Sequence, residues 1–398
     1  MKIVHWDEMF HPNFGYQINI LPVFQQKQGH DVFIVTSERP DEHPTFSGFA
    51  NKTDINSLDK KFETETGVKI IRLPIERVVS GRVIYKHGYI KFLNSLNADV
   101  IMCHTCDTLS AMIIIRNHKK INAPLVFDNH MLEMASVNPL RRFFRIYYKT
   151  FIAPIIVKNK FVVIRTQDDP YVTKCLGIPA VQAPYISFGT DILLYHPDNL
   201  VREEFRKKYG IGSDDFVIVY AGKTNTSKGG LLLAQALRHK FPTNKRVVIL
   251  LVSNYEKSDY GKNVEKAFNA SENTVIHFGT QVYRNLAEFY QAADLAVFAR
   301  QCSLSFFDVQ ASGLPVVSEN NSVNIGRVQS GNGFVFEAGN IDSFREKIAV
   351  CINMPKDEYA KMRAASVDYI YNNFNYENIA NQYTEILNSE RCRQNNAN

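Results

Sequence analysis

Short apolar runs alternate with segments of helical periodicity along this chain of 398 residues, and the alternation starts afresh in the second half. Continuous apolar runs separated by amphipathic helices are typical of parallel strands buried between two helical layers. The sequence therefore predicts two α/β domains built on parallel sheets. The runs expected as buried strands are residues 2–5, 32–36, 68–73, 100–103 and 125–127, then 216–220, 247–252, 275–278, 295–298 and 315–317.

A polar, charged stretch, residues 195–215, separates the two sets of runs. We place the domain boundary beside it and predict domains at 1–192 and 193–375, followed by a terminal segment at 376–398. A chain of this length commonly forms about two domains. Open α/β sheets bind ligands beyond the carboxyl ends of their strands, so two such domains facing each other would form a central cleft.

Composition narrows the class of protein. Hydrophobic residues make up 45% and charged residues 22%, as in ordinary globular proteins, and a net charge of +6 does not suggest a nucleic-acid partner. The N-terminus lacks the apolar core of a signal peptide, and no run of about 18 apolar residues predicts a membrane span. Six scattered cysteines favour a reducing compartment, so we expect a cytoplasmic protein. Cys103 and Cys106 form one CxxC with no second ligand pair, and we predict no metal site there.

The second half contains a strand, FVIVYAG, that leads through Gly222 and Lys223 into Ser227-Lys228-Gly229-Gly230 and a helical run. Two lysines at the end of a strand can neutralise a diphosphate, and the glycines let the backbone come close. A solvated loop with two surface lysines explains the same residues equally well.

A second polar loop, residues 301–305, precedes a short helix and the strand that follows Gly313-Leu314-Pro315. Gln301, Ser303 and Ser305 would present polar groups and free backbone N–H groups at a helix N-terminus, which suits phosphate oxygens. Asp308, one turn into that helix, can accept hydrogen bonds from ribose hydroxyls. Complementing the helix dipole is an equally good explanation for this carboxylate.

Two residues of the first half are candidates for the reaction centre. Gly15 lies between the first strand and the first helix, where glycine permits close approach of the backbone to a ligand, or simply makes a turn. His130 ends the apolar run PLVFDNH, where it would lie beyond the carboxyl end of a strand. A lone histidine is more often structural; Asp7, His104 and Glu133 are weaker candidates nearby.

These segments together resemble the family 4 glycosyltransferases, which have the GT-B fold of two Rossmann-like domains. The resemblance runs from MKIVHW, FGYQ and QGHDVFIVTS through PLVFDNH and ISFGTDILLYHP to the two-lysine loop, VIHFGTQVYRNLAEFYQAADLAVF and DVQASGLPVV. It covers about residues 1–390, and the order and spacing of the motifs are more specific than any one of them.

The resemblance implies an N-terminal acceptor-binding domain, a C-terminal domain that binds the nucleotide sugar, and a last helix that returns to the first domain. Lys223 and Lys228 match the basic pair that holds the donor diphosphate, Asp308 stands where the family usually has a ribose-binding Glu, and His130 matches a histidine near the anomeric carbon. The family's other Glu, eight residues earlier, is Arg300 here. This departure puts the identity of the sugar and the way it is held in doubt.

The reaction that the resemblance implies is sugar transfer from a UDP-sugar, or secondarily a GDP-sugar, with retention of configuration. No metal is required, because His130, Lys223 and Lys228 would act by position and charge. The acceptor would be a glycan or a lipid-linked sugar in bacterial surface polysaccharide synthesis, an expectation that rests on family analogy. The alternatives are a non-catalytic, degenerate transferase that acts as a partner subunit, which Arg300 motivates, and a UDP-sugar epimerase on the same fold.

Residues 141–160 contain six Lys or Arg and no acid. Residues 141–156 can form a helix with Arg141, Arg145 and Lys149 on one face. Aromatic and aliphatic residues would lie on or near another face: Phe144, Tyr147, Tyr148, Phe151 and Ile155. Such a helix could place the protein on an anionic membrane surface, on the inner face of the cell membrane, or could pack on its own domain with solvated arginines. Pro154 is expected to kink or end it.

Overall fold

The computed structural model describes residues 1–42, 54–79, 81–136 and 138–396. These residues pack as two compact units, one made of Met1–Phe188 with Tyr376–Asn398 and the other of Gly189–Asn375. The chain passes into the second unit four residues before the boundary predicted at 192/193. The reason is local, because Thr190 is bonded within the second unit to Phe374 and Asp308.

The first unit contains a six-stranded parallel sheet in the order β3-β2-β1-β6-β7-β8. Its strands are β1 (Lys2–Trp6), β2 (Asp31–Ser37), β3 (Lys69–Leu73), β6 (Val100–Cys103), β7 (Leu125–Asn129) and β8 (Val163–Arg165). The order reverses at β1, between β2 and β6. In open sheets, ligands bind beyond the carboxyl ends of the strands at such a reversal.

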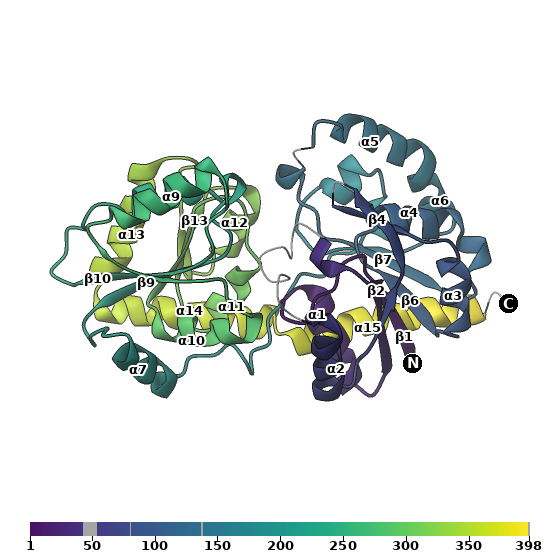
Figure 1. Ribbon diagram of the computed structural model, residues 1–398, viewed down its shortest axis with the longest axis horizontal. Helices are drawn as coiled ribbons and strands as arrows, with labels where there is room; N and C mark the ends of the chain where they lie inside the picture. Colours follow the sequence, from purple (N-terminus) through teal and green to yellow (C-terminus); the bar gives the residue numbers. More distant parts are fainter. Residues whose placement is uncertain (43–53, 80, 137, 397–398) are drawn as a thin grey trace. The chain divides into compact units, whose positions relative to one another are not determined.

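Helices cover both faces of this sheet (Figure 1). They are α1 (Gln17–Lys27), α2 (Ile55–Thr66), α3 (Tyr89–Ser95), α4 (Leu109–Arg116), α5 (Arg141–Tyr147), α6 (Ala153–Lys158) and α15 (Tyr376–Asn395). The last helix, α15, packs against α1, β6 and β7, and its Tyr376 ring stacks on Phe24. A short antiparallel hairpin, β4 (Ile75–Val79) and β5 (Arg82–Tyr85), completes the unit.

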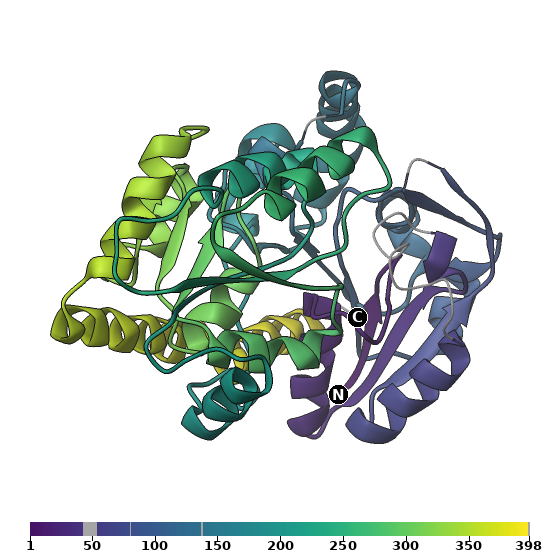
Figure 2. The same cartoon turned by 60° about the vertical axis from the view of Figure 1, so that its left-hand side comes forward.

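The second unit repeats the topology, with a parallel sheet in the order β11-β10-β9-β12-β13-β14. The strands are β9 (Phe216–Ala221), β10 (Val247–Val252), β11 (Thr274–Phe278), β12 (Leu295–Phe298), β13 (Val316–Glu319) and β14 (Gly333–Phe336). The helices are α7 (Asn199–Lys208), α8 (Gly230–Ala236), α9 (Asp259–Asn269), α10 (Leu286–Ala292), α11 (Ser305–Ala311), α12 (Ser322–Arg327), α13 (Ile341–Asn353) and α14 (Lys356–Asn373). Figures 1 and 2 show both helical layers around this sheet, as predicted for an α/β class protein.

Each predicted run either lies inside an observed strand or extends past its end by one residue. The sequence did not indicate β8, β14 or the β4–β5 hairpin. Each is short, and β14 begins at the last residue of a Gly-Asn-Gly sequence that predicts a turn. Strand β7 extends to Asn129, so His130 follows it directly.

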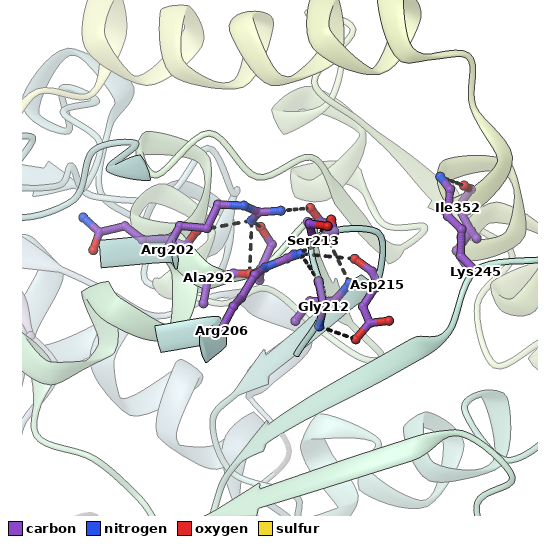
Figure 3. A network of polar contacts seen from close by, with 12 residues as sticks. Arg202, Arg206, Gly212, Ser213, Asp215, Lys245, Ala292 and Ile352 are labelled. Atoms are coloured by element: carbon purple, nitrogen blue, oxygen red, sulfur yellow. Dashed lines mark hydrogen bonds and ion pairs between the residues drawn. The ribbon is translucent and has the colours of Figure 1, made fainter. Parts of the chain in front are cut away.

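The polar stretch expected between the domains is an ordered part of the second unit. Two arginines of its helix α7 reach Asp294 at the start of β12: Arg202 lies 2.6 Å and Arg206 2.7 Å from the two carboxylate oxygens. The Arg206 guanidinium also donates to the carbonyl oxygens of Gly212, Ser213 and Asp215 (Figure 3). The buried guanidinium group of Arg206 is therefore well supplied with partners, and these contacts fix α7 against the sheet.

The single helix predicted over residues 141–156 is divided in three. Helix α5 ends at Tyr147, a π-helical turn spans Tyr148–Ile152, and α6 begins at Ala153 with Pro154 in its first turn. Proline is accepted there because it removes no helical hydrogen bond. Pro154 therefore does not end the helical segment, which continues to Lys158, and the α-helical pattern changes to a π turn just before it.

The predicted apolar face of this segment is largely the face that packs on the protein. Tyr148 is fully buried, and Phe144, Tyr147 and Ile155 pack against the core. Phe151 of the predicted set is exposed (55%), together with three apolar side chains outside that set: Leu140 (65%), Phe143 (73%) and Ile146 (64%). Among helices of the described residues, none combines the length and apolar character needed to cross a membrane.

Candidate functional site

The two-lysine loop connects β9 to α8 in the second unit. Asn225 caps it, since its side-chain oxygen accepts hydrogen bonds from the Lys228 N–H (3.0 Å) and the Ser227 hydroxyl (2.8 Å). Lys223 is exposed and Lys228 is half-buried. The loop is therefore an ordered structure with one lysine in water and one held against the protein.

Three glycines shape this loop. Gly222 has φ 153° and Gly229 has φ 70°, backbone conformations that favour glycine. A Cβ on Gly230 would lie only 2.0 Å from the carbonyl oxygen of Thr224. The loop can hold its present path only because no side chain stands at this position.

Lys228 joins the loop to the second polar segment, residues 301–305. Its Nζ donates a hydrogen bond to the carbonyl oxygen of Cys302 at 2.8 Å. Burial lowers the pKa of Lys228, and the positive charges of Arg327 and Lys223 lower it further. Cations that repel one another in this way are stabilised by a bound anion, which makes this the strongest anion-binding candidate among the predicted residues.

The segment 301–305 is held by its backbone. Gln301 has φ 58°, and its N–H donates to a Glu319 carboxylate oxygen at 3.0 Å. The carbonyl oxygen of Gln301 accepts from the Asn324 amide at 3.1 Å, and that of Ser303 accepts from Arg327 at 3.0 Å. The Ser303 hydroxyl accepts from the backbone N–H of Ser305, the first residue of α11, at 3.3 Å.

Arg300, which stands at the position of a family Glu, lies beside the same carboxylate. Its Nε is 3.9 Å from Glu319, and it donates to the carbonyl oxygen of Thr226 at 3.2 Å. Arg300 thus ties the lysine loop to β13 and does not leave an unpaired charge at this place.

Asp308 is almost completely buried in α11 and already has partners. One carboxylate oxygen, Oδ1, accepts from the Thr190 hydroxyl (2.5 Å) and from the Tyr283 hydroxyl (3.1 Å). Burial raises the pKa of Asp308 to about 7, and these two hydrogen bonds only partly oppose the shift. Any ribose hydroxyl would have to use the other oxygen.

His130 and Gly15 belong to the first unit. Gly15 precedes Tyr16, the N-cap of α1, in a loop that Asn19 fixes by donating to the carbonyl oxygen of His11 at 2.9 Å. Gly15 is not among the glycines with positive φ, so a left-handed backbone does not explain it. His130 is partly exposed, and its Nε2 lies 3.1 Å from Asp128 Oδ2.

Asp128 also accepts from His104, whose Nδ1 is 2.8 Å from the same oxygen. His104, Asp128 and His130 carry atoms that can bind metals and lie within 4.8 Å of one another. However, His104 uses its second ring nitrogen too, at 2.9 Å from His5. With both nitrogens engaged, His104 has none to offer a metal, and the geometry is that of a hydrogen-bonded cluster.

Sequence reasoning found the lysine loop and the 301–305 segment, which Lys228 brings together. It did not find the side chains that hold them: Glu319, Asn324, Arg327, Thr190 and Tyr283. These lie 18 or more residues away in sequence from their partners, and no local motif marks them. Asp128 and His5 were also missed, although a histidine within a strand buried on both faces was a visible signal.

Comparisons with known proteins relate the chain to glycosyltransferases. Residues 201–395 match the family described as Glycosyl transferases group 1. The chain is 24% identical over 198 residues to the lipopolysaccharide 1,2-N-acetylglucosaminetransferase of Salmonella typhimurium, an alignment that covers 47% of this chain and 51% of that protein. The alignment thus spans about half the length of this curated relative.

Solved structures resemble the whole chain. HepE of Anabaena in complex with UDP-glucose has a TM-score of 0.72 at 18% identity, covering 98% of this chain and 100% of that one. A glycosyltransferase of Rickettsia africae has a TM-score of 0.72 at 15% identity, covering 98% of both chains. Likeness at these identities shows the fold, and it confirms the predicted class of two Rossmann-like domains of the GT-B type.

Proposed function

The chain carries a domain of the Glycosyl transferases group 1 family at residues 201–395, and from this premise we propose that it transfers a sugar from a nucleoside diphosphate donor to a glycan or lipid-linked acceptor. We propose UDP-sugars as donors ahead of GDP-sugars, family 4 as the closer grouping, and retention of anomeric configuration. The process would be bacterial surface polysaccharide synthesis. Two relatives guide the choice of donors, since one is named for N-acetylglucosamine transfer and another was solved with UDP-glucose.

The observation that carries this proposal is the junction between Lys228 and the 301–305 segment. A diphosphate bound there would meet the ammonium groups of Lys223 and Lys228 together with the polar groups of Gln301, Ser303 and Ser305. It would replace mutual repulsion among the cations with attraction. The glycines after Lys228 let the loop pack directly against Thr224 and Arg300, which holds Lys228 in place.

The proposed chemistry is transfer by position and charge. The bond between the anomeric carbon and the diphosphate oxygen breaks as the acceptor oxygen forms its bond to that carbon. Lys223 and Lys228 stabilise the negative charge on the departing diphosphate, which accepts the proton of the acceptor hydroxyl. His130 would bind the sugar or the leaving phosphate, and Gly15 would let the backbone approach.

No metal is needed in this scheme, because the two lysines supply the charge that a cation would supply. Asp308 has a narrower role than the resemblance implies. Its Oδ1 holds Thr190 and Tyr283, so we assign the ribose, if it binds here, to Oδ2 alone.

We further propose that the first unit docks on an anionic membrane surface through the exposed side chains of Leu140, Phe143, Ile146 and Phe151, which we call the apolar ridge. Arg141 and Arg142 beside it are exposed and can reach lipid phosphates. Arg145 is excluded from this role, because it is half-buried and pairs with Glu133 at 3.4 Å.

Sedimentation with vesicles of phosphatidylglycerol and phosphatidylcholine tests whether the apolar ridge binds membranes. The variant with Phe143→Ser and Ile146→Ser should lose binding, while Leu200→Ser, an equally exposed apolar change on α7, should keep it. Wild type that fails to sediment with anionic vesicles at low salt would contradict membrane docking.

Nucleotide release from a panel of UDP- and GDP-sugars, beginning with UDP-glucose and UDP-N-acetylglucosamine, tests the enzymatic proposal. Lys228→Ala should lose one strong charged contact and slow release about ten- to a hundredfold. The exposed change Lys262→Ala on α9 is the matched control and should have no effect. Donor binding without turnover, even with oligosaccharide acceptors, would favour the non-catalytic partner, and interconversion of the donor sugar without transfer would favour an epimerase.

A further inference from the structure

A chain of buried polar side chains crosses the first unit from α15 to His130. The Gln25 amide N–H donates to Thr384 at 3.4 Å, and its oxygen lies 2.7 Å from His5 Nε2. His5 Nδ1 lies 2.9 Å from His104 Nε2, and His104 Nδ1 lies 2.8 Å from Asp128 Oδ2. Four of these side chains are buried: Gln25, His5, His104 and Asp128. Each of their polar atoms must therefore have a hydrogen-bond partner inside the protein.

Which partner donates in each of these hydrogen bonds follows from Thr384, at the end farthest from His130. The Thr384 hydroxyl donates its single hydrogen to the Gln28 side-chain oxygen at 3.0 Å, and Gln28 donates its own N–H to Asn381 at 2.8 Å. Thr384 can therefore only accept from Gln25. The Gln25 nitrogen faces Thr384, and its oxygen must face His5.

An oxygen facing His5 Nε2 requires a hydrogen on that nitrogen. Two ring nitrogens 2.9 Å apart need one hydrogen between them, so one of the two histidines must carry a second proton; Asp128, 2.8 Å from His104, places that proton on His104 and leaves His5 Nδ1 with a lone pair. His104 Nε2 must then donate to it. At its other end His104 faces a carboxylate, which accepts only, so His104 Nδ1 must donate as well.

We infer that His104 is a buried imidazolium ion, protonated on both nitrogens, which pairs with Asp128 and thereby positions His130 and sets the charge that His130 faces. This is a positioning role for His104, Asp128 and His5. The charge state concerns the protein itself, whereas its effect on catalysis rests on the proposed function.

The electrostatic directions agree with the hydrogen bonds. Burial opposes the charge on His104, but the neighbouring Asp128 outweighs it and raises the pKa of His104. Burial lowers the pKa of His5 to about 3, and His104 beside it lowers it further. Burial alone would raise the pKa of Asp128, but the two histidines hold it well below its usual range.

Other titratable groups face this cluster. Asp7, at the end of β1, has a pKa raised to about 6 by burial, against the opposing charges of His104 and His130. Cys103 and Tyr383 also face the Asp128 charge, which helps to raise their pKa values and keeps both neutral. Asp128 is thus the permanent negative charge of the cluster, and Asp7 adds to it as the pH rises.

The pairing determines what His130 meets. Its Nε2 lies 3.1 Å from the oxygen that His104 also binds. With His104 charged, Asp128 is one half of an ion pair, and it is this pair that orients His130. The Phe188 ring, edge-on at 5.2 Å, fixes the other side of the imidazole.

Nuclear magnetic resonance of the protein labelled with ¹⁵N-histidine tests the charge state without any substrate. At pH 7, both ring nitrogens of His104 should be protonated and His5 should carry its hydrogen on Nε2 alone. Asp128→Asn and His5→Leu should each convert His104 to a neutral ring. A neutral His104 in the wild type would overturn the inference.

The pH dependence of donor turnover tests the positioning role. His104→Gln keeps a donor toward Asp128 but removes the positive charge, so His130 faces an uncompensated carboxylate. The activity profile should move upward by about one pH unit, while a merely structural loss would lower activity equally at every pH. His239→Gln should leave the profile unchanged.

The two tests fail separately. If the resonance pattern is as expected but no sugar nucleotide is turned over at any pH, the proposed function is wrong and the charged His104 stands. If turnover occurs and its profile does not move in His104→Gln, the positioning role is overturned.

Discussion

Gly230 offers the sharpest structural test of the lysine loop. An alanine at this position would place its Cβ 2.0 Å from the Thr224 carbonyl oxygen, 2.7 Å from its carbonyl carbon and 3.0 Å from its Cα. Comfortable contact requires about 3.5 Å between such atoms. The obstruction is backbone, which cannot rotate away, so Gly230→Ala must displace the loop between Thr224 and α8.

The magnitude follows from that displacement. Moving the loop by about 1 Å shifts Lys228 relative to the 301–305 segment, and misplacement on this scale costs about a hundredfold in rate. The overpacking itself should lower the free energy of unfolding by about 1–3 kcal/mol. We therefore expect folded protein with strongly reduced turnover, rather than loss of the fold.

Two assays measured on the same samples check this prediction, nucleotide release from the best donor and thermal unfolding. Gly326→Ala is the matched control, because a Cβ there meets open space and its effect on stability should stay within about 1 kcal/mol. A Gly230→Ala protein with wild-type turnover would refute the claim that this loop path is required.

Two further predictions concern buried charges of the second unit. Burial raises the pKa of Asp308 to about 7 from an ordinary value of 3.8, so between about pH 4 and 7 the folded state keeps a proton that the unfolded state releases. The contribution of Asp308 to stability is full below about pH 4 and is lost as the pH rises to 7; urea unfolding of Asp308→Asn should lack this decline, and an equal decline in both proteins would contradict the assignment. Arg206→Ala should lower the free energy of unfolding by about 3–5 kcal/mol, because it leaves Asp294 buried with only part of its pairing. Arg246, whose side chain is about half exposed, pairs with Asp215, and this pair should be worth less than about 1 kcal/mol in the matching Arg246→Ala variant; equal losses in the two variants would show that burial of the arginine does not matter here.

The sequence predicted the strands well for a physical reason. Strands of a doubly covered parallel sheet are buried on both faces, so they appear as continuous apolar runs such as 216–220 and 247–252. Strands β8 and β14 have only three and four residues and so give a shorter apolar run. Of the apolar positions expected on residues 141–156, Tyr148 lies in the core and Phe151 is exposed, and the π turn at Tyr148–Ile152 is a local departure from α-helical periodicity that the sequence did not indicate.

The candidate site was predictable where one segment carries it. Lys223, Lys228 and the nearby glycines form a local pattern with a clear physical purpose. The groups that hold them come from distant segments, as Glu319 does for Gln301 and Thr190 for Asp308, and only the folded chain brings them together. The hydrogen bonds that connect His5 and His104 to His130 could not be predicted for the same reason. His5 and His104 lie in or directly after apolar runs that predict only strands.

A calorimetric titration of UDP into the wild type, Lys228→Ala and Lys262→Ala tests the central claim, that the lysine loop binds the donor diphosphate. Our account predicts saturable binding to the wild type and to Lys262→Ala, with affinity about ten- to a hundredfold weaker in Lys228→Ala. No binding of UDP by the wild type, or equal affinity in all three proteins, would contradict it.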